Sequence, residues 1–279
     1  MSMTARSLIP ILAFSFFAGG TLTGQATAGL TLSWTNNLLS VSGPNLPGRT
    51  LDIWYLEAFC RSGSTKRDWW QTVFPHKTTL VSAGRDGKRL QFLTRFDPAV
   101  EVIHEVRAGR DEVEFTYKLT NRGHAPVDVN WFQPACIRVA RFTGRSQSNY
   151  TARSFIFTER GLTMLDQTRR TEEAVYRGGQ VYVPKGINLA DVNPRPLCGD
   201  APVNGLIGCF SADDQWLMAT ASDSTHELFE GIFVCLHSDP HLGGLAPGET
   251  KRVRSKLYLM KNDVKALLKR YRRDFGKQD

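Results

Sequence analysis

The densest group of side chains that could carry acid–base chemistry is the run His237-Ser238-Asp239-Pro240-His241. In an extended chain alternate side chains point to the same face, so His237, Asp239 and His241 would lie together. Imidazole and carboxylate groups side by side suit proton transfer or the binding of a metal ion. Pro240 and the glycines that follow indicate a turn equally well, in which Asp239 would cap the loop backbone. We predict His237 and Asp239 as catalytic residues and expect no bound metal.

A second group, Asp191-Val192-Asn193-Pro194-Arg195-Pro196, lies in a long segment, residues 160–205, where the apolar pattern weakens. The prolines would stiffen a loop that presents a carboxylate, an amide and a guanidinium group. Such donors and acceptors suit the hydroxyls or the carboxylate of a sugar. The alternative is a structural Asx-turn in which Arg195 pairs with a nearby acid. Because long irregular segments often carry function, we predict that Asp191, Asn193 and Arg195 bind substrate.

Aromatic side chains could add to such a site. The run Trp131-Phe132-Gln133-Pro134 and the pair Trp69-Trp70 offer flat faces that can stack on the apolar face of a sugar ring. Aromatic residues in sandwich proteins more often pack in the core. We predict that Trp131 and Gln133 bind substrate.

Two further residues could transfer protons. His76 lies in the run Phe-Pro-His-Lys, and Glu227 follows His226 just before an expected strand that begins at Gly231. We include His76 and Glu227 among the catalytic residues. The ordinary alternative for Glu227 and for Glu230 is an exposed carboxylate in a loop.

Familiar catalytic motifs are absent from the sequence. It contains no Gly-x-Ser-x-Gly elbow, no His-Glu-x-x-His pair, no phosphate-binding loop and no dinucleotide fingerprint. We therefore disfavour serine-hydrolase, zincin and nucleotide chemistry, and we expect no cofactor.

The cysteines show no metal-binding spacing. There are five, an odd number, so at least one thiol lacks an intramolecular partner, and their positions are Cys60, Cys136, Cys198, Cys209 and Cys235. Cys209 and Cys235 lie in apolar, strand-like runs, which favours ordinary buried thiols in the core.

The elements that must position these residues are strands. Short runs rich in Val, Ile, Leu, Phe and Tyr recur between turn residues, which predicts an all-β fold, an antiparallel β-sandwich of the supersandwich type. We expect strands at 30–34, 38–42, 51–59, 73–81, 89–94, 100–106, 112–120, 127–132, 137–142, 154–157, 206–210, 216–221, 231–236 and 253–259. Residues 109–111 and 212–215 read as hairpin turns.

One amphipathic helix is expected at the end of the chain, over residues 262–275. Asn262 could cap it, and its apolar residues fall at helical spacing: Val264, Leu267, Leu268, Tyr271 and Phe275. The protein has a net charge of +8, and Lys and Arg exceed Asp and Glu by the same number between Lys251 and Asp279. The rest of the protein is therefore close to neutral. We expect the helix to dock on the sandwich with its basic charges outward, and we expect no nucleic-acid partner.

The first 28 residues read as a secretory signal peptide. Arg6 precedes an apolar run from Leu8 to Ala18, and Ala26-Thr27-Ala28 supplies the small residues around a cut before Gly29. The run is short for a membrane span, so a permanent anchor is the weaker alternative. We predict a secreted or periplasmic protein with a single domain over residues 29–279 and no integral membrane segment after cleavage.

Several stretches resemble the galactose mutarotase-like β-supersandwich of aldose epimerases and of many polysaccharide lyases and glycoside hydrolases. They are Asp111-Glu112-Val113-Glu114-Phe115, Thr120-Asn121, Trp131-Phe132-Gln133, the segment Gly231 to Leu236, and Leu245-Ala246-Pro247-Gly248-Glu249, within Val100 to Leu259. The chain is also similar to uncharacterised secreted bacterial proteins that share segments like Asp-Val-Asn-Pro-Arg-Pro-Leu and Gly-Leu-Ile-Gly-Cys-Phe.

The resemblance implies a carbohydrate-related protein without the epimerase reaction. The family's acid histidine would fall at Val129, and the strand that resembles the one with its basic glutamate, Ile232 to Leu236, has no carboxylate. Ring epimerisation needs both an acid and a base, so mutarotase activity is improbable.

We predict a secreted carbohydrate-active protein that binds or cleaves a glycan, by hydrolase or lyase chemistry if it is an enzyme. The alternative is a non-catalytic binding or structural module of the periplasm or cell surface, in which the polar candidates would be scattered. The sequence does not indicate an oligomeric state.

Overall fold

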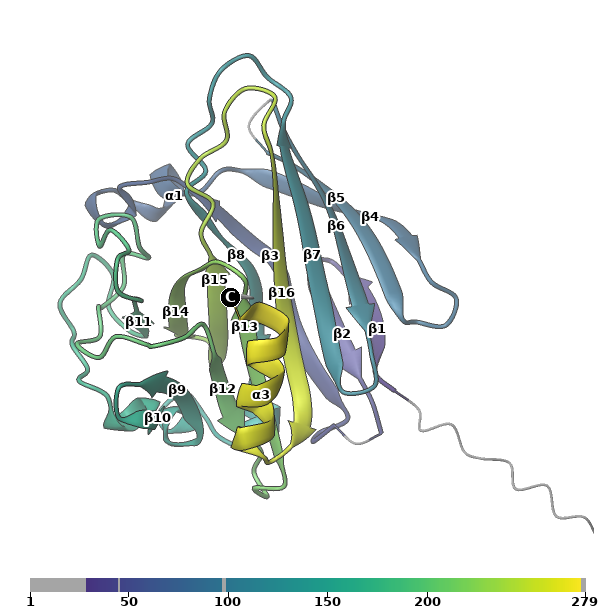
Figure 1. Ribbon diagram of the computed structural model, residues 1–279, viewed down its shortest axis with the longest axis vertical. Coiled ribbons are helices and arrows are strands. Elements are labelled where there is room, and N and C mark those ends of the chain that lie inside the picture. Colours follow the sequence, from purple (N-terminus) through teal and green to yellow (C-terminus); the bar gives the residue numbers. More distant parts are fainter. Residues whose placement is uncertain (1–28, 45, 97–98, 277–279) are drawn as a thin grey trace, which may run out of the picture.

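The protein folds as two antiparallel sheets packed face to face, with a helix at the end of the chain (Figure 1). The computed structural model describes residues 29–44, 46–96 and 99–276. The expected signal peptide lies outside the described residues. The all-β sandwich predicted from the sequence is confirmed.

The smaller sheet has seven strands in the order β1-β2-β3-β8-β15-β14-β11. Its strands are β1 Thr31–Thr35, β2 Leu38–Ser42, β3 Thr50–Cys60, β8 Trp131–Arg138, β11 Gln180–Tyr182, β14 Thr225–Gly231 and β15 Cys235–Pro240.

The larger sheet has nine strands in the order β10-β9-β12-β13-β16-β7-β6-β5-β4. Its strands are β4 His76–Ala83, β5 Arg89–Phe96, β6 Val100–Ala108, β7 Glu112–Asn121, β9 Ser154–Thr158, β10 Gly161–Met164, β12 Ile207–Phe210, β13 Trp216–Ser222 and β16 Thr250–Lys261. The helices are α1 Trp69–Thr72, α2 Ala140–Thr143 and α3 Val264–Phe275, with 3₁₀ turns η1 Ser64–Lys66, η2 Tyr150–Arg153 and η3 Leu165–Gln167.

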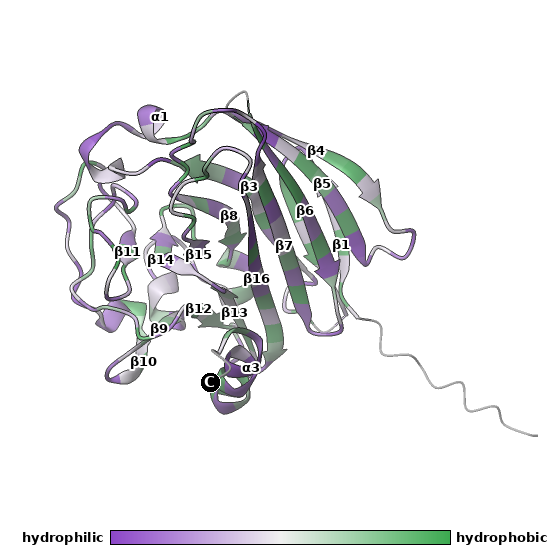
Figure 2. Cartoon of the chain, turned by 45° about the horizontal axis from the view of Figure 1, so that its top comes forward, coloured by the Kyte–Doolittle hydropathy of each residue, from purple (hydrophilic) through white to green (hydrophobic). Residues whose placement is uncertain are grey.

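The core lies between the sheets because alternate side chains of each strand point to it. Ile53 and Leu236 of the smaller sheet pack in one buried cluster with Val102, Phe115 and Leu257 of the larger sheet. The alternation of apolar and polar residues along β5, β6 and β7 is visible in Figure 2. Burial of one face of each sheet therefore fixes strand register throughout.

Two expected strands are in fact one. The sequence predicted separate strands at 127–132 and 137–142, but β8 runs without a break through Pro134, and Phe142 belongs to α2. Proline is tolerated here because the β3–β8 register shifts between Tyr55 and Ala58, so the ladder is interrupted opposite Pro134. The irregularity is a β-bulge in β3.

The region around Gly231 also differs from the prediction. The strand expected over residues 231–236 is interrupted by a hairpin turn at 232–234, with Val234 at φ 53°; Cys235 and Leu236 begin β15, and the expected loop before Gly231 is strand β14. The sequence pattern of this strand is hard to recognise because three of its buried side chains are polar: His226, Glu227 and Glu230. They lie beneath residues 159–205, which cover this part of the sheet. That segment itself contributes β10 and β11.

The terminal helix confirms its predicted apolar face. Leu267 is buried and its apolar neighbours, among them Val264 and Tyr271, pack against β9, β13 and β16. The cap differs, since Asp263 and not Asn262 accepts a hydrogen bond from the Ala266 amide at 2.9 Å. Along residues 29–44, 46–96 and 99–276 no helix is both long enough and apolar enough to cross a membrane.

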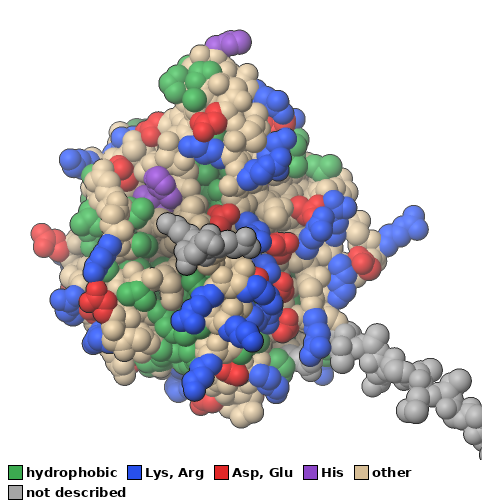
Figure 3. All heavy atoms as spheres, viewed as in Figure 1, with side chains coloured by type: hydrophobic (Ala, Val, Ile, Leu, Met, Phe, Trp, Pro, Cys, Tyr) green, Lys and Arg blue, Asp and Glu red, His purple; other side chains and the backbone are tan. Residues whose placement is uncertain are grey.

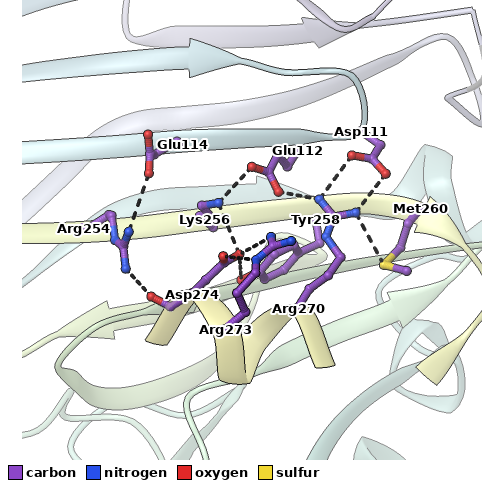
Figure 4. Close-up of polar contacts among 10 residues, drawn as sticks. All are labelled: Asp111, Glu112, Glu114, Arg254, Lys256, Tyr258, Met260, Arg270, Arg273 and Asp274. Atoms are coloured by element: carbon purple, nitrogen blue, oxygen red, sulfur yellow. Dashed lines mark hydrogen bonds and ion pairs between the residues drawn. The ribbon is translucent and has the colours of Figure 1, made fainter. Parts of the chain in front are cut away.

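Part of the basic charge near the C-terminus points inward, contrary to prediction. Arg270 of α3 donates to Asp111 at 2.8 Å and to Glu112 (Figure 4). Lys256 of β16 contacts Glu112 at 2.8 Å and Asp274 of α3 at 3.2 Å. These pairs join the helix to β16 and to the start of β7.

The rest of the helix carries its charge outward. Figure 3 shows Lys and Arg side chains gathered over α3, with acidic side chains of the adjacent strands beside them. The exposed basic residues of the helix are Lys265, Lys269, Arg272 and Arg273.

Replacing Arg270 by Ala should lower the free energy of unfolding by about 1.5–3 kcal/mol, the range for charge-assisted hydrogen bonds. Its side chain is 17% exposed and connects two carboxylates of β7 and the preceding turn. Arg273→Ala on the same helix is the control, because that side chain is 64% exposed and pairs only with the adjacent Asp274, and we expect a change below about 0.5 kcal/mol. Urea unfolding measures both. Equal losses in the two variants would contradict the ion-pair account.

Candidate functional site

A cavity of about 280 Å³ opens on the face of the smaller sheet that points away from the core. Leu236 of β15 packs in the core, so its neighbours Cys235 and His237 face outward. The lining also includes side chains from β3, β8, α1 and the segment 176–195: Glu57, Trp69, Gln133, Cys136, Tyr176, Asn193 and Arg195, with Phe229, Ile232 and Phe233.

The strand pairing explains the row of polar groups beneath the cavity. His237 and Asp239 alternate along β15, as predicted, and the antiparallel register places Phe229 and Glu227 of β14 opposite them. His241 follows the strand, where its ring stacks on that of His226 at 5.2 Å. The turn alternative for Asp239 is therefore not what the structure shows.

The β-bulge in β3 brings Glu57 to the same place. The extra residue between Tyr55 and Ala58 changes the facing of the strand, so Tyr55 lies in the core while Glu57 lines the cavity. Its Oε2 lies 3.8 Å from Nε2 of His237. The Glu57 side chain is 31% exposed, whereas that of His237 is 1% exposed.

The His237 ring is surrounded by groups that can hydrogen-bond or carry charge. Nε2 lies 3.4 Å from the Cys235 sulfur, and Nδ1 lies 3.7 Å from Oδ1 of Asp239. Gln133 donates to the other oxygen of Asp239 at 3.0 Å. Among the described residues, neither Nδ1 of His237 nor Oδ1 of Asp239 has a hydrogen-bond partner, although both atoms are buried.

Glu227 lies deeper. Its Oε2 accepts a hydrogen bond from the backbone amide of Asn193 at 2.9 Å, and its Oε1 has no partner within the part of the chain that the structure describes. The expectation that Glu227 and Glu230 are exposed is wrong, since both are buried and Glu230 is held by Arg170 at 2.6 Å. Glu227 anchors the Asn193 backbone and so holds the covering segment on the sheet.

Burial shifts the pKa values of this cluster. It raises the pKa of Glu57, against the effect of His237, and raises the pKa of Glu227 well above its usual value, with Asp239 adding to the effect. Burial also raises the pKa of Asp239, partly offset by His237. For His237 burial acts downward, but Cys235 and Asp239 outweigh it and the pKa is raised well above the usual range. The three carboxyls and the imidazole therefore favour their protonated forms, whereas the pKa of the Cys235 thiol is lowered well below its usual value by Cys136 and His237.

Several predicted binding residues converge on this cavity. Gln133, Asn193 and Arg195 line it with His237. The Arg195 guanidinium lies 5.4 Å from the centre of the Tyr176 ring and donates to the Arg177 carbonyl. Asp239 and Glu227 lie beneath the lining, fully buried, where they cannot contact a bound molecule.

Three other predicted residues lie elsewhere or have structural roles. His76 contacts the carbonyls of Phe74 and Leu56, each at 3.2 Å, and is not among the lining residues. Asp191 accepts from the backbone amide of Gly63 at 2.6 Å, so its role is structural, but this long-range contact differs from the Asx-turn that the sequence left open.

Trp131 is buried behind the cavity. Its Nε1 donates to Ser64 at 3.1 Å, and its ring stacks on that of His226 at 5.6 Å. Trp131 therefore packs in the interior, which is the alternative that the sequence left open, and does not bind substrate. Its neighbour Trp69 forms an aromatic wall of the cavity. Sequence reasoning missed Glu57, Cys136 and Cys235 as site residues.

A larger hollow of about 740 Å³ lies between α3 and residues 199–205. Its carboxylate Asp200 is already paired with Arg169 at 3.0 Å and with Arg160 at 3.3 Å. Among the described residues, the buried carboxylate and imidazole atoms without partners gather beneath the smaller cavity or beside it. We therefore take the cavity of about 280 Å³ as the candidate functional site.

Comparison with known proteins finds similarity in outline alone. No protein-family model and no curated protein sequence matches the chain. A protein from Synechocystis sp. PCC 6803 matches at 9% identity, over 92% of this chain and 99% of that one, with a TM-score of 0.45. An aldose epimerase homologue from C. elegans matches at 8% identity, over 84% and 99%, with a TM-score of 0.44. A galactose mutarotase-like protein from Lactobacillus casei ATCC 334 matches at 9% identity, over 83% and 100%, with a TM-score of 0.43.

The chain thus loosely resembles galactose mutarotase-like sandwiches at low sequence identity. The position at which the resemblance would place the acid histidine, Val129, lies in the core. The basic glutamate would fall in the segment Ile232 to Leu236. Residues 232–234 of this segment form a turn and carry no carboxylate. The two-sheet architecture is established by the pairing of this chain's own strands.

Replacing Glu227 by Gln should change how stability depends on pH. Because the pKa of Glu227 is raised in the folded protein, its contribution to stability is present at acidic pH and is lost as the pH rises through the folded pKa. Wild type should therefore lose stability relative to the variant as the pH rises above the pKa of the unfolded carboxyl, about 4.3. The loss should be about 1.4 kcal/mol for each pH unit in which the carboxyl is ionised in the unfolded chain but still protonated in the folded protein.

Urea unfolding over this pH range measures the difference. Glu173→Gln is the control, since Glu173 is exposed, and its profile should run parallel to that of wild type. A parallel profile for Glu227→Gln as well would contradict the assignment of a raised pKa to Glu227.

Proposed function

We propose that this protein is an exported carbohydrate-active protein that holds one sugar residue of a glycan in the cavity beneath residues 176–195. The observation that supports this most is the composition of the cavity, which combines aromatic walls, a guanidinium group, two amides and one accessible carboxyl. Sugar sites need this combination, because a pyranose ring has apolar faces and a polar rim. Export by the leader of residues 1–28 is part of the proposal.

The two kinds of lining group would act on different parts of the sugar. Trp69 and Tyr176 would cover the apolar face of the ring, while Gln133 and Asn193 would hydrogen-bond its hydroxyls. Arg195 is the cationic side chain of the lining and would pair with a carboxylate or hydroxyls. An acidic sugar residue would use all of these groups.

Glu57 is the residue that would act on the bound sugar. Its side chain is the accessible carboxyl of the lining, and burial raises its pKa against the opposing effect of His237, which keeps a proton available nearer to neutral pH. Cleavage of a glycosidic bond by hydrolysis or by β-elimination requires a group that donates or accepts a proton at this point. His237, buried behind it, would position Glu57 and set its charge.

The convergence of the polar groups favours this function over a non-catalytic module. That alternative predicts scattered candidates, whereas four of the nine predicted residues line one cavity: Gln133, Asn193, Arg195 and His237. Binding and cleavage are measured separately, because the same lining would serve both. A broad polysaccharide panel, read out by reducing ends and by the absorbance of unsaturated uronates, tests the proposal. Neither cleavage nor glycan-array binding across the panel would refute it.

Trp69→Ala should weaken glycan binding by about 10- to 100-fold, because a stacked aromatic side chain at the centre of a site contributes roughly 1.4–2.8 kcal/mol. Trp70→Ala is a matched control from the same helix: Trp70 is 73% exposed and does not line the cavity, so its loss should change affinity less than about twofold. Affinity for a glycan identified on the panel is measured by calorimetry. Equal effects of the two substitutions would exclude this cavity as the binding site.

Glu57→Gln should abolish cleavage while leaving glycan affinity within about threefold, because the amide keeps the shape of the side chain but cannot transfer the proton. A fall in rate of about 100-fold or more is the expected magnitude for removing a general acid or base. Glu173→Gln is the matched control, since Glu173 is exposed and does not line the cavity, and it should leave the rate unchanged. Full activity of Glu57→Gln would assign the proton transfer to another group.

A further inference from the structure

We propose that Cys136, Cys235 and His237 bind a single Zn²⁺ ion at the floor of the cavity. The three residues come from adjacent strands β8 and β15 and each offers one ligand atom, all within 4.8 Å of one another. The proposal goes beyond glycan binding and does not depend on it.

The spacing of the donor atoms suits a tetrahedral ion. In such a site, with Zn–S near 2.3 Å and Zn–N near 2.0–2.1 Å, neighbouring sulfur and nitrogen ligands lie about 3.5 Å apart. The Cys235 sulfur lies 3.4 Å from Nε2 of His237. Because Cys235 and His237 are two residues apart on a strand, their side chains share a face and their spacing is set by the backbone.

The surroundings orient the histidine as metal sites require. A ligating histidine usually has its second ring nitrogen beside a carboxylate, which holds the ring in place and makes the ligating nitrogen more basic. Nδ1 of His237 lies 3.7 Å from Oδ1 of Asp239, and Gln133 holds the other oxygen of Asp239 at 3.0 Å. Nε2 is thereby turned toward the sulfur of Cys235.

The burial of the donors adds a second, independent argument. All three residues are buried. Among the described residues, Oε2 of Glu57, which lies 3.8 Å from Nε2 of His237, is a buried oxygen atom without a hydrogen-bond partner. Buried polar atoms without partners are rare, and a bound ion is one of the established reasons for them. Two thiolates would neutralise the charge of Zn²⁺, and zinc accepts this mixture of sulfur and nitrogen donors.

Three protein ligands leave one coordination position, and the cavity is where it would open. Glu57 faces the same side of the His237 ring as Cys235: its Oε2 lies 3.8 Å from Nε2 of His237 and has no hydrogen-bond partner among the described residues. Three protein ligands with an open fourth position are typical of catalytic rather than structural zinc sites. Glu57 would accept a hydrogen bond from a water molecule or a sugar hydroxyl at that position.

Cobalt binding to the reduced, metal-free protein tests the proposal without any glycan. Adding Co²⁺ should produce a sulfur-to-cobalt charge-transfer absorption in the near ultraviolet and intense visible bands of a tetrahedral ion, and Zn²⁺ should abolish both. After exposure to Zn²⁺ and dialysis, we expect retention of about one zinc ion per chain and a higher unfolding temperature.

Cys136→Ser and Cys235→Ser should each lose the charge-transfer band and the retained zinc. Cys209→Ser is the matched control, because Cys209 is also a buried free thiol but lies on β12 of the other sheet, and it should keep both signals. The wild-type spectrum decides the question even if a serine variant fails to fold.

Two results would overturn the proposal. One is a reduced wild-type protein that gives no cobalt–thiolate absorption and retains no zinc, including the case in which Cys136 and Cys235 form a disulfide as isolated. The other is an equal loss of zinc in Cys209→Ser and Cys235→Ser. Both readouts are independent of sugar, so a failure of the glycan assays leaves this test unchanged, and the reverse also holds.

Discussion

The pairing of β14 with β15 is the interaction on which the candidate site depends. It places Glu227 opposite Asp239 and Phe229 opposite His237, and so aligns ionisable groups on a sheet face that would otherwise meet solvent. These groups are stable there only because residues 159–205 exclude water and because Asn193 bonds to Glu227. The covering segment, in turn, is held by the carboxylate that it buries. Sheet pairing, burial and the shifted pKa values are therefore parts of one arrangement, which a break in the β14–β15 ladder would remove.

The rest of the sandwich makes this arrangement rigid. The smaller sheet is supported from behind by the core that it shares with the larger sheet, where Ile53 and Leu236 pack against Phe115 and Leu257. At the far side of the larger sheet α3 is joined to β16 by paired charges, among them Lys256 with Asp274. Side chains that project from paired strands keep their spacing better than side chains on loops, which is what both proton transfer and metal binding need. The bulge in β3 is the local irregularity that adds Glu57 to the face.

Periodicity predicted most of the fold. The hairpin turns, the strands with apolar alternation and the apolar face of the terminal helix were all readable because one face of each is buried in a continuous core. Strand β14 could not be predicted in this way, because three of its buried side chains are polar and polar residues are normally expected at the surface: His226, Glu227 and Glu230. His237, Asn193 and Arg195 were singled out by residue type alone, and the structure places all three in the lining of one cavity. Glu57 and the Cys136–Cys235 pair escaped notice, since a bulge and a contact between β8 and β15 are not visible in local sequence.

The central claim is that the cavity beside Glu57 and Arg195 holds a sugar residue. A crystal structure of the protein with a bound oligosaccharide tests it most directly. The account predicts density for a sugar ring against Trp69, with its polar rim within hydrogen-bond distance of Glu57 and Arg195. Density for the oligosaccharide in the larger hollow between α3 and residues 199–205, with the cavity over His237 empty, would contradict it.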